Sequence, residues 1–258
     1  MSYDFIGSSK FMNFVKFSIL RVSLGLSSKV LNLQTVEISL NMKNETVKYE
    51  VPSIVTILFQ GDSITEACRD RTKDADMGTG YVKMVANRFS TEYAGKRVRF
   101  LNRGVGGDRV RDLKNRWQKD CLNLEPEIVS ILIGINDTVG KYFWNKPTST
   151  KSFEEDYRII LEQTHDILGA KIVLLTPFIV YMTKLQLINK IVLKQKIGAV
   201  KKLSKEFQTL LIPLDRIFDE ATRKRAATYW STDGIHPTQM GHSLIAQSWL
   251  KSVSAILR

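Results

Sequence analysis

Residues 54–65, IVTILFQGDSIT, set the fold of this chain. They begin with a short, β-rich apolar run, Ile54 to Phe59, which predicts a strand that ends at Gly61. Two small polar residues, Asp62 and Ser63, follow the strand directly. Further apolar runs lie at residues 98–101, 128–133, 171–175 and 210–214. The chain therefore carries about five short strands, the first of which leads into polar residues.

Longer segments with helical spacing of apolar residues lie between these runs. They cover residues 81–93, 110–121, 153–168, 185–207 and 239–257. Strands that alternate with helices predict a parallel sheet, and right-handed crossovers place helices on both of its faces. We expect an α/β fold of three layers, α/β/α, on a doubly wound sheet. Ligand sites of such sheets form beyond the carboxyl ends of the strands.

The composition is that of a globular protein. Of the 258 residues, 43% are hydrophobic and 25% charged, which excludes a mostly disordered chain. Residues 1–50 differ from the rest, because charges interrupt the apolar stretch 11–33 and leave no signal-peptide core. We expect residues 1–50 to be an N-terminal extension of unassigned role and residues 51–258 to be one domain. The extension could be an amphipathic helix at a membrane surface, a strand-rich arm, or sequence upstream of a start at Met42.

The net charge of +12 raises the question of an anionic partner. Residues 184–205 hold seven basic residues and no acidic one, but their apolar residues recur at helical spacing. The same stretch has no aromatic residue on which a base could stack. We therefore expect solvated helix faces and no nucleic-acid partner.

Cysteine content and hydropathy bear on location. The two cysteines, Cys68 and Cys121, are too few for a disulfide framework. They could pair, but a reducing compartment is the simpler interpretation. No apolar run reaches the length of about 18 residues that a membrane-spanning helix needs. We expect a cytoplasmic protein and no membrane contact.

Four polar segments follow strands or lie near the C-terminus, and together they suit acyl transfer. They are residues 61–65, 102–108, 134–137 and 233–237. A serine nucleophile needs a base, and the base needs a group that holds its tautomer. Asp233 and His236 are close enough in sequence to form that pair in one turn. The backbone N–H groups of Ser63 and Gly107 and the side-chain amide of Asn136 could stabilise an oxyanion.

Each segment alone also has a structural interpretation. Asp62 and Ser63 could cap a helix, and Asp233 and His236 could form a buried hydrogen bond. The glycines of residues 104–107 hint at a dinucleotide loop, but Arg109 stands where the last glycine is required. The order of all four segments is what favours catalysis.

This order resembles the SGNH (GDSL-type) hydrolases over residues 54–250, through Gly-Asp-Ser, Gly-Gly-Asp, Gly-x-Asn-Asp and Asp-x-x-His. The resemblance implies a flavodoxin-like sheet of about five strands in residues 51–258, the SGNH hydrolase fold, and no metal or cofactor. It implies that Ser63 is the nucleophile, His236 the base and Asp233 its partner, with Ser63, Gly107 and Asn136 as the oxyanion hole. Arg103, Trp117, the run 131–138 and the pair 229–230 are similar to carbohydrate acetylesterases and short-chain acylhydrolases.

Substrate contacts and the remaining reactive side chains are less well defined by the sequence. Aromatic walls at Trp144 and Trp230, together with Asp62, are candidate substrate-binding residues. We expect Cys68 to be a small buried residue on the helix after Ser63, with a second nucleophile as the alternative. We expect His242 to cap or pack at the start of the last helix, and no zinc site.

We consider three functions, ranked from the most to the least expected. The first is a serine esterase for short acyl groups, chiefly acetyl, on a small-molecule or carbohydrate ester. The second is a lysophospholipase or thioesterase for longer acyl chains, and the third is a non-catalytic binding module. With a neutral histidine as base, we expect activity to rise through roughly pH 6–7.

Overall fold

The computed structural model describes residues 34–40, 45–51, 54–92, 97–139 and 147–254. The chain divides into two compact units, residues 1–54 and 55–258. In the first, β1 (Gln34–Leu40) and β2 (Glu45–Val51) pair antiparallel, with Gln34 opposite Val51. These are the strands that one interpretation of the extension expects, whereas residues 11–33 and Met42 lie outside the described residues.

The second unit alternates strands and helices. Its strands are β3 (Val55–Gly61), β4 (Val98–Gly104), β5 (Ile128–Leu132), β6 (Lys171–Leu175) and β7 (Leu210–Ile212). Its longer helices are α2 (Tyr81–Glu92), α3 (Val110–Asp120), α5 (Thr150–Gln163), α6 (Lys184–Glu206), α7 (Leu214–Lys224) and α9 (Gln239–Val253). Its short helices are α1 (Ser63–Glu66), η1 (Leu122–Leu124), α4 (Ile135–Val139), η3 (Thr164–Leu168) and α8 (Ala227–Trp230).

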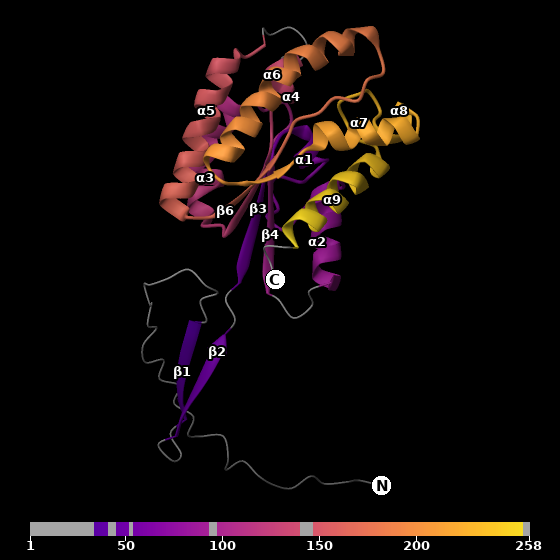
Figure 1. Ribbon diagram of the computed structural model, residues 1–258. Helices are drawn as coiled ribbons and strands as arrows, with labels where there is room; N and C mark the ends of the chain where they lie inside the picture. Colours follow the sequence, from indigo (N-terminus) through magenta and orange to yellow (C-terminus); the bar gives the residue numbers. More distant parts are fainter. Residues whose placement is uncertain (1–33, 41–44, 52–53, 93–96, 140–146, 255–258) are drawn as a thin grey trace, which may run out of the picture. The chain divides into compact units, whose positions relative to one another are not determined.

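The sheet has the strand order β4-β3-β5-β6-β7, and all neighbours are parallel (Figure 1). This order is the flavodoxin-like arrangement, with the chain direction across the sheet reversing between β3 and β5. The predicted fold class is confirmed. The carboxyl ends of β3, β4 and β5 therefore lie together at one end of the sheet, where the polar segments begin.

Helices cover both faces of the sheet, with α3, α5 and α6 on one side and α2 and α9 on the other (Figure 1). The interior strand β3 is buried on both faces because its side chains alternate between two cores. Ile57 and Phe59 belong to the core under α2 and α9, whereas Leu58 belongs to the core under α3 and α5.

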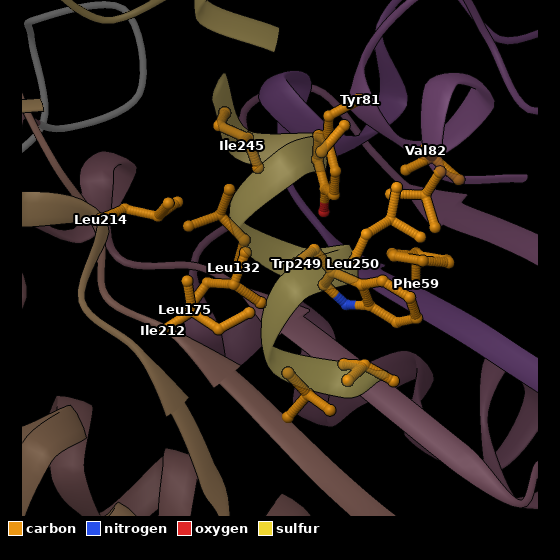
Figure 2. Packing of buried hydrophobic residues seen from close by; sticks show 14 of the residues in the cluster. Phe59, Tyr81, Val82, Leu132, Leu175, Ile212, Leu214, Ile245, Trp249 and Leu250 are labelled. Atoms are coloured by element: carbon orange, nitrogen blue, oxygen red, sulfur yellow. The ribbon is translucent and has the colours of Figure 1, made fainter. Parts of the chain in front are cut away.

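Trp249 anchors the last helix to the sheet (Figure 2). Its ring lies 5.2 Å from that of Phe59, centroid to centroid, and its Nε1 donates to Ser130 Oγ at 3.0 Å. The hydrogen bond satisfies the two buried polar groups of this contact. It also fixes α9, whose first turn borders the site.

The structure corrects the last predicted strand and adds helix α7, which the sequence did not predict, and short helices. The run 210–214 is a strand only to Ile212, because Pro213 starts α7 and cannot donate to a ladder. Three lysines of the basic stretch pair with acids, Lys190 with Asp219, Lys201 with Asp215 and Lys202 with Glu154. In the described residues, no helix has the length and apolar character needed to cross a membrane.

Candidate active site

Ser63 starts the short helix α1 directly after β3. Asp62 is its N-cap, with a carboxylate that accepts a hydrogen bond from the Ile64 N–H at 3.0 Å. The helix ends at Ala67, which has a left-handed backbone conformation with φ of 43°. Strand β3 therefore places Ser63 at the carboxyl end of the sheet, in the first turn of a capped helix.

The structure brings Ser63, His236 and Asp233 together in one line of hydrogen bonds. Ser63 Oγ lies 3.0 Å from His236 Nε2, and His236 Nδ1 lies 2.6 Å from Asp233 Oδ2. Ser63 and His236 are 173 positions apart in the sequence. About half of the surface of the His236 and Asp233 side chains is exposed.

Asp233 is held as a carboxylate. Partial burial opposes its ionisation, but hydrogen bonds from the His236 ring and from backbone N–H groups outweigh it and lower the pKa. Those N–H groups belong to Ile235 and His236, at 2.8 and 2.7 Å from Oδ1. A fixed negative charge beside Nδ1 keeps the proton on that nitrogen and leaves Nε2 free to accept one.

The loop that carries this pair is tied to the body of the domain. Ser231 Oγ donates to the His236 carbonyl at 2.8 Å and accepts from the Gly234 N–H at 2.9 Å. The side chain of Gln186, in the first turn of α6, donates to the Asp233 carbonyl. Gly234 has φ of 90°, and a Cβ there would collide with Gln186. These contacts determine the position of the imidazole.

The predicted oxyanion donors lie in segments that are joined to each other. Gly107 is in the turn after β4 with φ of 82°, and the preceding Gly106 N–H donates to Glu66 Oε2 at 2.6 Å. Asn136, in α4, donates one amide hydrogen to the Asp108 carbonyl at 3.0 Å and keeps a second hydrogen for a ligand. Within the described residues, no protein acceptor is recorded for the N–H groups of Ser63 and Gly107.

A cavity of about 520 Å³ opens beside Ser63 and His236. One wall is α1 and the residues after it, and the other is the start of α9. Its lining residues are Ser63, Ile64, Glu66, Ala67, Cys68, Thr79, His236, Pro237, Gln239 and His242. The lining mixes polar side chains with apolar ones, among them Ile64, Ala67 and Pro237.

The prediction of a buried Cys68 is wrong. Its side chain is exposed, and the residue follows α1 with φ of 60° rather than continuing the helix. The left-handed residue Ala67 ends the helix after one turn and turns Cys68 toward the cavity. The other cysteine, Cys121, is buried.

Two of the predicted substrate-binding residues have other contacts. Asp62 is 1% exposed, does not line the cavity, and has a pKa raised to about 7 by burial. The indole of Trp230 donates to the Ala221 carbonyl at 3.1 Å and is absent from the cavity lining. Both side chains support the fold around the site. Trp144 lies outside the described residues.

Sequence reasoning missed Glu66 and Asp137. Glu66 connects α1 to the Gly106 turn, and its other oxygen pairs with Arg71. Asp137 is fully buried and accepts from the Val110 N–H at 3.1 Å, so it joins α4 to the start of α3. Asp137 stands beside Asn136 in the quoted segment, but nothing in the sequence says which of the two faces inward.

The other histidines have separate environments. His242 is buried against the cavity, as the packing interpretation expects. His165 is exposed beside Asp166. Among the described residues, no three histidine, cysteine or acidic side chains are arranged to hold a metal ion.

Known proteins resemble this chain in sequence and structure. The model of the GDSL-like Lipase/Acylhydrolase family matches residues 59–244. An acetylxylan esterase of Geobacillus stearothermophilus is 30% identical over 205 residues, 76% of this chain and 93% of that protein. A putative GDSL-like lipase of Parabacteroides merdae superposes with a TM-score of 0.73 at 33% identity, covering 78% of this chain and 95% of that one. The crystal structure of the Geobacillus esterase gives 0.72 at 29% identity, covering 77% and 94%.

Proposed function

The chain belongs to the GDSL-like lipase/acylhydrolase family and is a carboxylic ester hydrolase, and we propose that it removes short acyl groups, chiefly acetyl, from carbohydrate esters. The observation that carries the proposal is the hydrogen-bonded line from Ser63 through His236 to Asp233. It ends at a cavity large enough for a small ester.

In the proposed mechanism, Ser63 Oγ attacks the ester carbonyl while His236 Nε2 takes its proton. The Asp233 carboxylate stabilises the imidazolium that forms. The carbonyl oxygen becomes an oxyanion that accepts from the N–H groups of Ser63 and Gly107 and from Asn136 Nδ2. The C–O bond to the alcohol then breaks, and His236 gives its proton to the leaving oxygen.

The product of this first half is an acyl-enzyme on Ser63. Water attacks its carbonyl while His236 takes a proton from the water, and the same three donors hold the second oxyanion. Collapse of this intermediate breaks the bond to Ser63 Oγ, which regains the proton from His236. The acid leaves, and the site returns to its starting state.

One relative supports the choice of residues and of substrate. Solved structures of the Geobacillus acetylxylan esterase include catalytic mutants in which a serine, an aspartate or a histidine is replaced by alanine. The same three residue types form the hydrogen-bonded line in this chain. The name of that relative is the basis for proposing acetyl groups on a carbohydrate.

The cavity lining supports a short acyl group over a long one. Ala67, Cys68 and Thr79 are small, and the polar side chains of Glu66, Gln239 and His242 interrupt the apolar surface along which a long chain would lie. Rates with p-nitrophenyl esters of increasing chain length test this choice. We expect a maximum at acetyl or another short acyl group, whereas a maximum at about eight or more carbons would favour the lysophospholipase or thioesterase alternative.

The test of the reaction is hydrolysis of p-nitrophenyl acetate by the wild type and by Ser63→Ala, with intact-mass detection of an acyl adduct. We expect activity and an adduct of one acetyl group in the wild type and neither in the variant. Ser90→Ala is a matched control, because Ser90 is exposed on α2 and its hydroxyl donates to the Ala86 carbonyl of the same helix. Equal rates in the wild type and Ser63→Ala would overturn the proposal.

A further inference from the structure

His242 is a buried histidine that the proposed reaction does not use, and it borders the same cavity as His236. It lies in the first turn of α9, and its ring stacks on Tyr81 with 6.4 Å between centroids and an interplanar angle of 15°. The ring also packs directly on Gly80, since a Cβ there would lie 2.7 Å from His242 Cε1. These contacts fix the plane and the position of the ring.

One hydrogen bond fixes the tautomer of this ring. Tyr81 is the first residue of α2, and its backbone N–H donates to His242 Nδ1 at 3.1 Å. Nδ1 is therefore the acceptor, and the proton of the neutral ring is on Nε2. Burial and the neighbouring His236 lower the pKa of His242 to about 4, so the ring stays neutral at the pH at which a histidine base is active.

The Nε2–H group has no protein acceptor among the described residues. A polar atom without a protein partner is either sealed from solvent or open to it. In the described part of the chain, the sealed side-chain atoms are Arg69 Nε, Arg109 Nη2, Asp137 Oδ1 and Tyr157 Oη. His242 Nε2 is not one of them, so it is open to solvent. Because His242 lines the cavity, we take the cavity as the place where this donor meets a ligand.

The proton transfer in the proposed mechanism says which half of the ester lies near His242. The leaving oxygen receives its proton from His236 Nε2, so the alcohol half must lie on the side of His236. Pro237, Gln239 and His242 follow His236 in the chain and line the same cavity. A plain alkyl or aryl alcohol offers no hydroxyl there, whereas a sugar offers hydroxyl oxygens next to the ester.

We propose that His242 Nε2–H donates a hydrogen bond to a hydroxyl oxygen of the leaving alcohol and so selects esters of polyhydroxylated alcohols. The inference rests on the proposed function, because it uses the position of His236 as the acid that protonates the leaving group. His242 would contact the substrate away from the reacting atoms, and so would act mainly on binding.

The test compares His242→Asn with the wild type on two acetate esters. One is a methyl glycoside that carries one acetyl group beside free hydroxyls, and the other is phenyl acetate, which has no such hydroxyl. Asparagine places Oδ1 near the position of Nδ1 and keeps an acceptor for the Tyr81 N–H, but it has no donor at the Nε2 position. The kcat/KM for the glycoside should fall about 3- to 10-fold, mostly through KM, as expected for one hydrogen bond.

Phenyl acetate is the internal control for folding and for the proposed function. Its kcat/KM should change less than twofold in His242→Asn, and the pH profile should be that of the wild type. An equal loss on both esters, or no loss on either, would overturn the role of His242. Failure of the wild type to cleave phenyl acetate through Ser63 would instead overturn the proposed function.

A second measurement does not depend on His242→Asn being stable. In Ser63→Ala labelled with ¹⁵N-histidine, NMR should find His242 with a proton on Nε2, and the monoacetylated glycoside should shift that signal. Phenyl acetate should leave it unchanged. A His242 proton on Nδ1, or equal shifts with both esters, would contradict the inference.

Discussion

The site contains pairs of adjacent residues with opposite surroundings. Ser63 lines the cavity, while its neighbour Asp62 is 1% exposed. Asn136 is half-buried beside the Gly107 turn, while its neighbour Asp137 is fully buried. In each pair one residue has a role in the proposed mechanism and the side chain of the other joins the surrounding elements. We call Ser63, Asn136, Asp233 and His236 the reactive layer, and Asp62 and Asp137 the supporting layer.

The pKa of the same residue type is shifted in opposite directions in the two layers. Asp233 is half-exposed and accepts several hydrogen bonds, which lower its pKa despite the cost of partial burial. Burial raises the pKa of Asp62 to about 7 and that of Asp137 to about 6. The comparison teaches that exposure and hydrogen bonding, rather than residue type, decide which carboxylate can support catalysis. Changes in the reactive layer should reduce activity, and changes in the supporting layer should alter stability.

His236→Ala should have the largest effect on activity. Loss of the base should lower kcat by about 10⁴-fold or more. The melting temperature should move by no more than a few degrees, because about half of this side chain is already exposed. Steady-state kinetics and thermal unfolding on the same preparation measure both. A large fall in melting temperature would contradict the idea that the reactive layer contributes to activity and not to stability.

Asn136→Ala should have a smaller but still large effect. Removing one oxyanion donor should lower kcat by about 10²–10³-fold with little change in KM. Asn136→Asp is a matched variant that keeps the size of the side chain but has no amide hydrogen to donate, and it should lose activity as well. Activity retained in Asn136→Asp would contradict the assignment of this donor.

Asp62→Asn tests the supporting layer through the pH dependence of stability. The folded pKa of Asp62, about 7, lies above its ordinary value, so the folded state binds the proton more tightly than the unfolded state. This contribution to stability is fully present below about pH 4 and is lost as the pH rises toward 7. Asparagine can keep the cap on the Ile64 N–H and has no proton to lose.

The expected result is that Asp62→Asn loses less stability than the wild type between pH 4 and pH 8. The difference should be on the order of 1 kcal/mol or more, measured by urea unfolding at several pH values. Ser90→Ala should follow the wild type. Parallel stability curves for Asp62→Asn and the wild type would show that Asp62 is not a buried group that titrates in this range.

Modification of the two cysteines compares an exposed side chain with a buried one. We expect its effect on activity to be the smallest of these predictions. Cys68 is exposed and lines the cavity beside Ser63, whereas burial raises the pKa of the Cys121 thiol to about 12. N-ethylmaleimide should therefore modify Cys68 first, and the adduct should reduce activity severalfold by occupying part of the cavity. Cys68→Ser should be active and resistant to the reagent, whereas Cys121→Ser should stay sensitive. Full activity after modification of Cys68 would count against its place in the cavity.

The sequence was sufficient to predict the strands and the long helices other than α7, which no predicted segment covers. Apolar runs such as 128–133 mark strands whose two faces are both covered, and helical spacing marks α2, α3 and α9. It was insufficient for α1 and α4, because four or five residues are too few to carry a helical period. The order of the strand ends was enough to select the residues that the structure brings together around Ser63.

What the sequence could not give was the direction of individual side chains. Asp62 and Trp230 stand next to or near catalytic candidates, yet one caps a helix and the other donates to a backbone carbonyl. Cys68 is exposed because Ala67 adopts a left-handed conformation that its residue type does not announce. The contact of His242 with Tyr81 joins residues 161 positions apart, so no local pattern signals it.

The central claim is that Ser63 is the one nucleophile of this hydrolase. Treatment with an alkyl fluorophosphonate, followed by peptide mass mapping and an assay of residual p-nitrophenyl acetate hydrolysis, tests it most directly. We predict a single phosphonyl adduct on Ser63, formed in step with the loss of activity and absent in Ser63→Ala and in His236→Ala. Activity that persists after Ser63 is modified, or that is lost through an adduct on another residue, would contradict the claim.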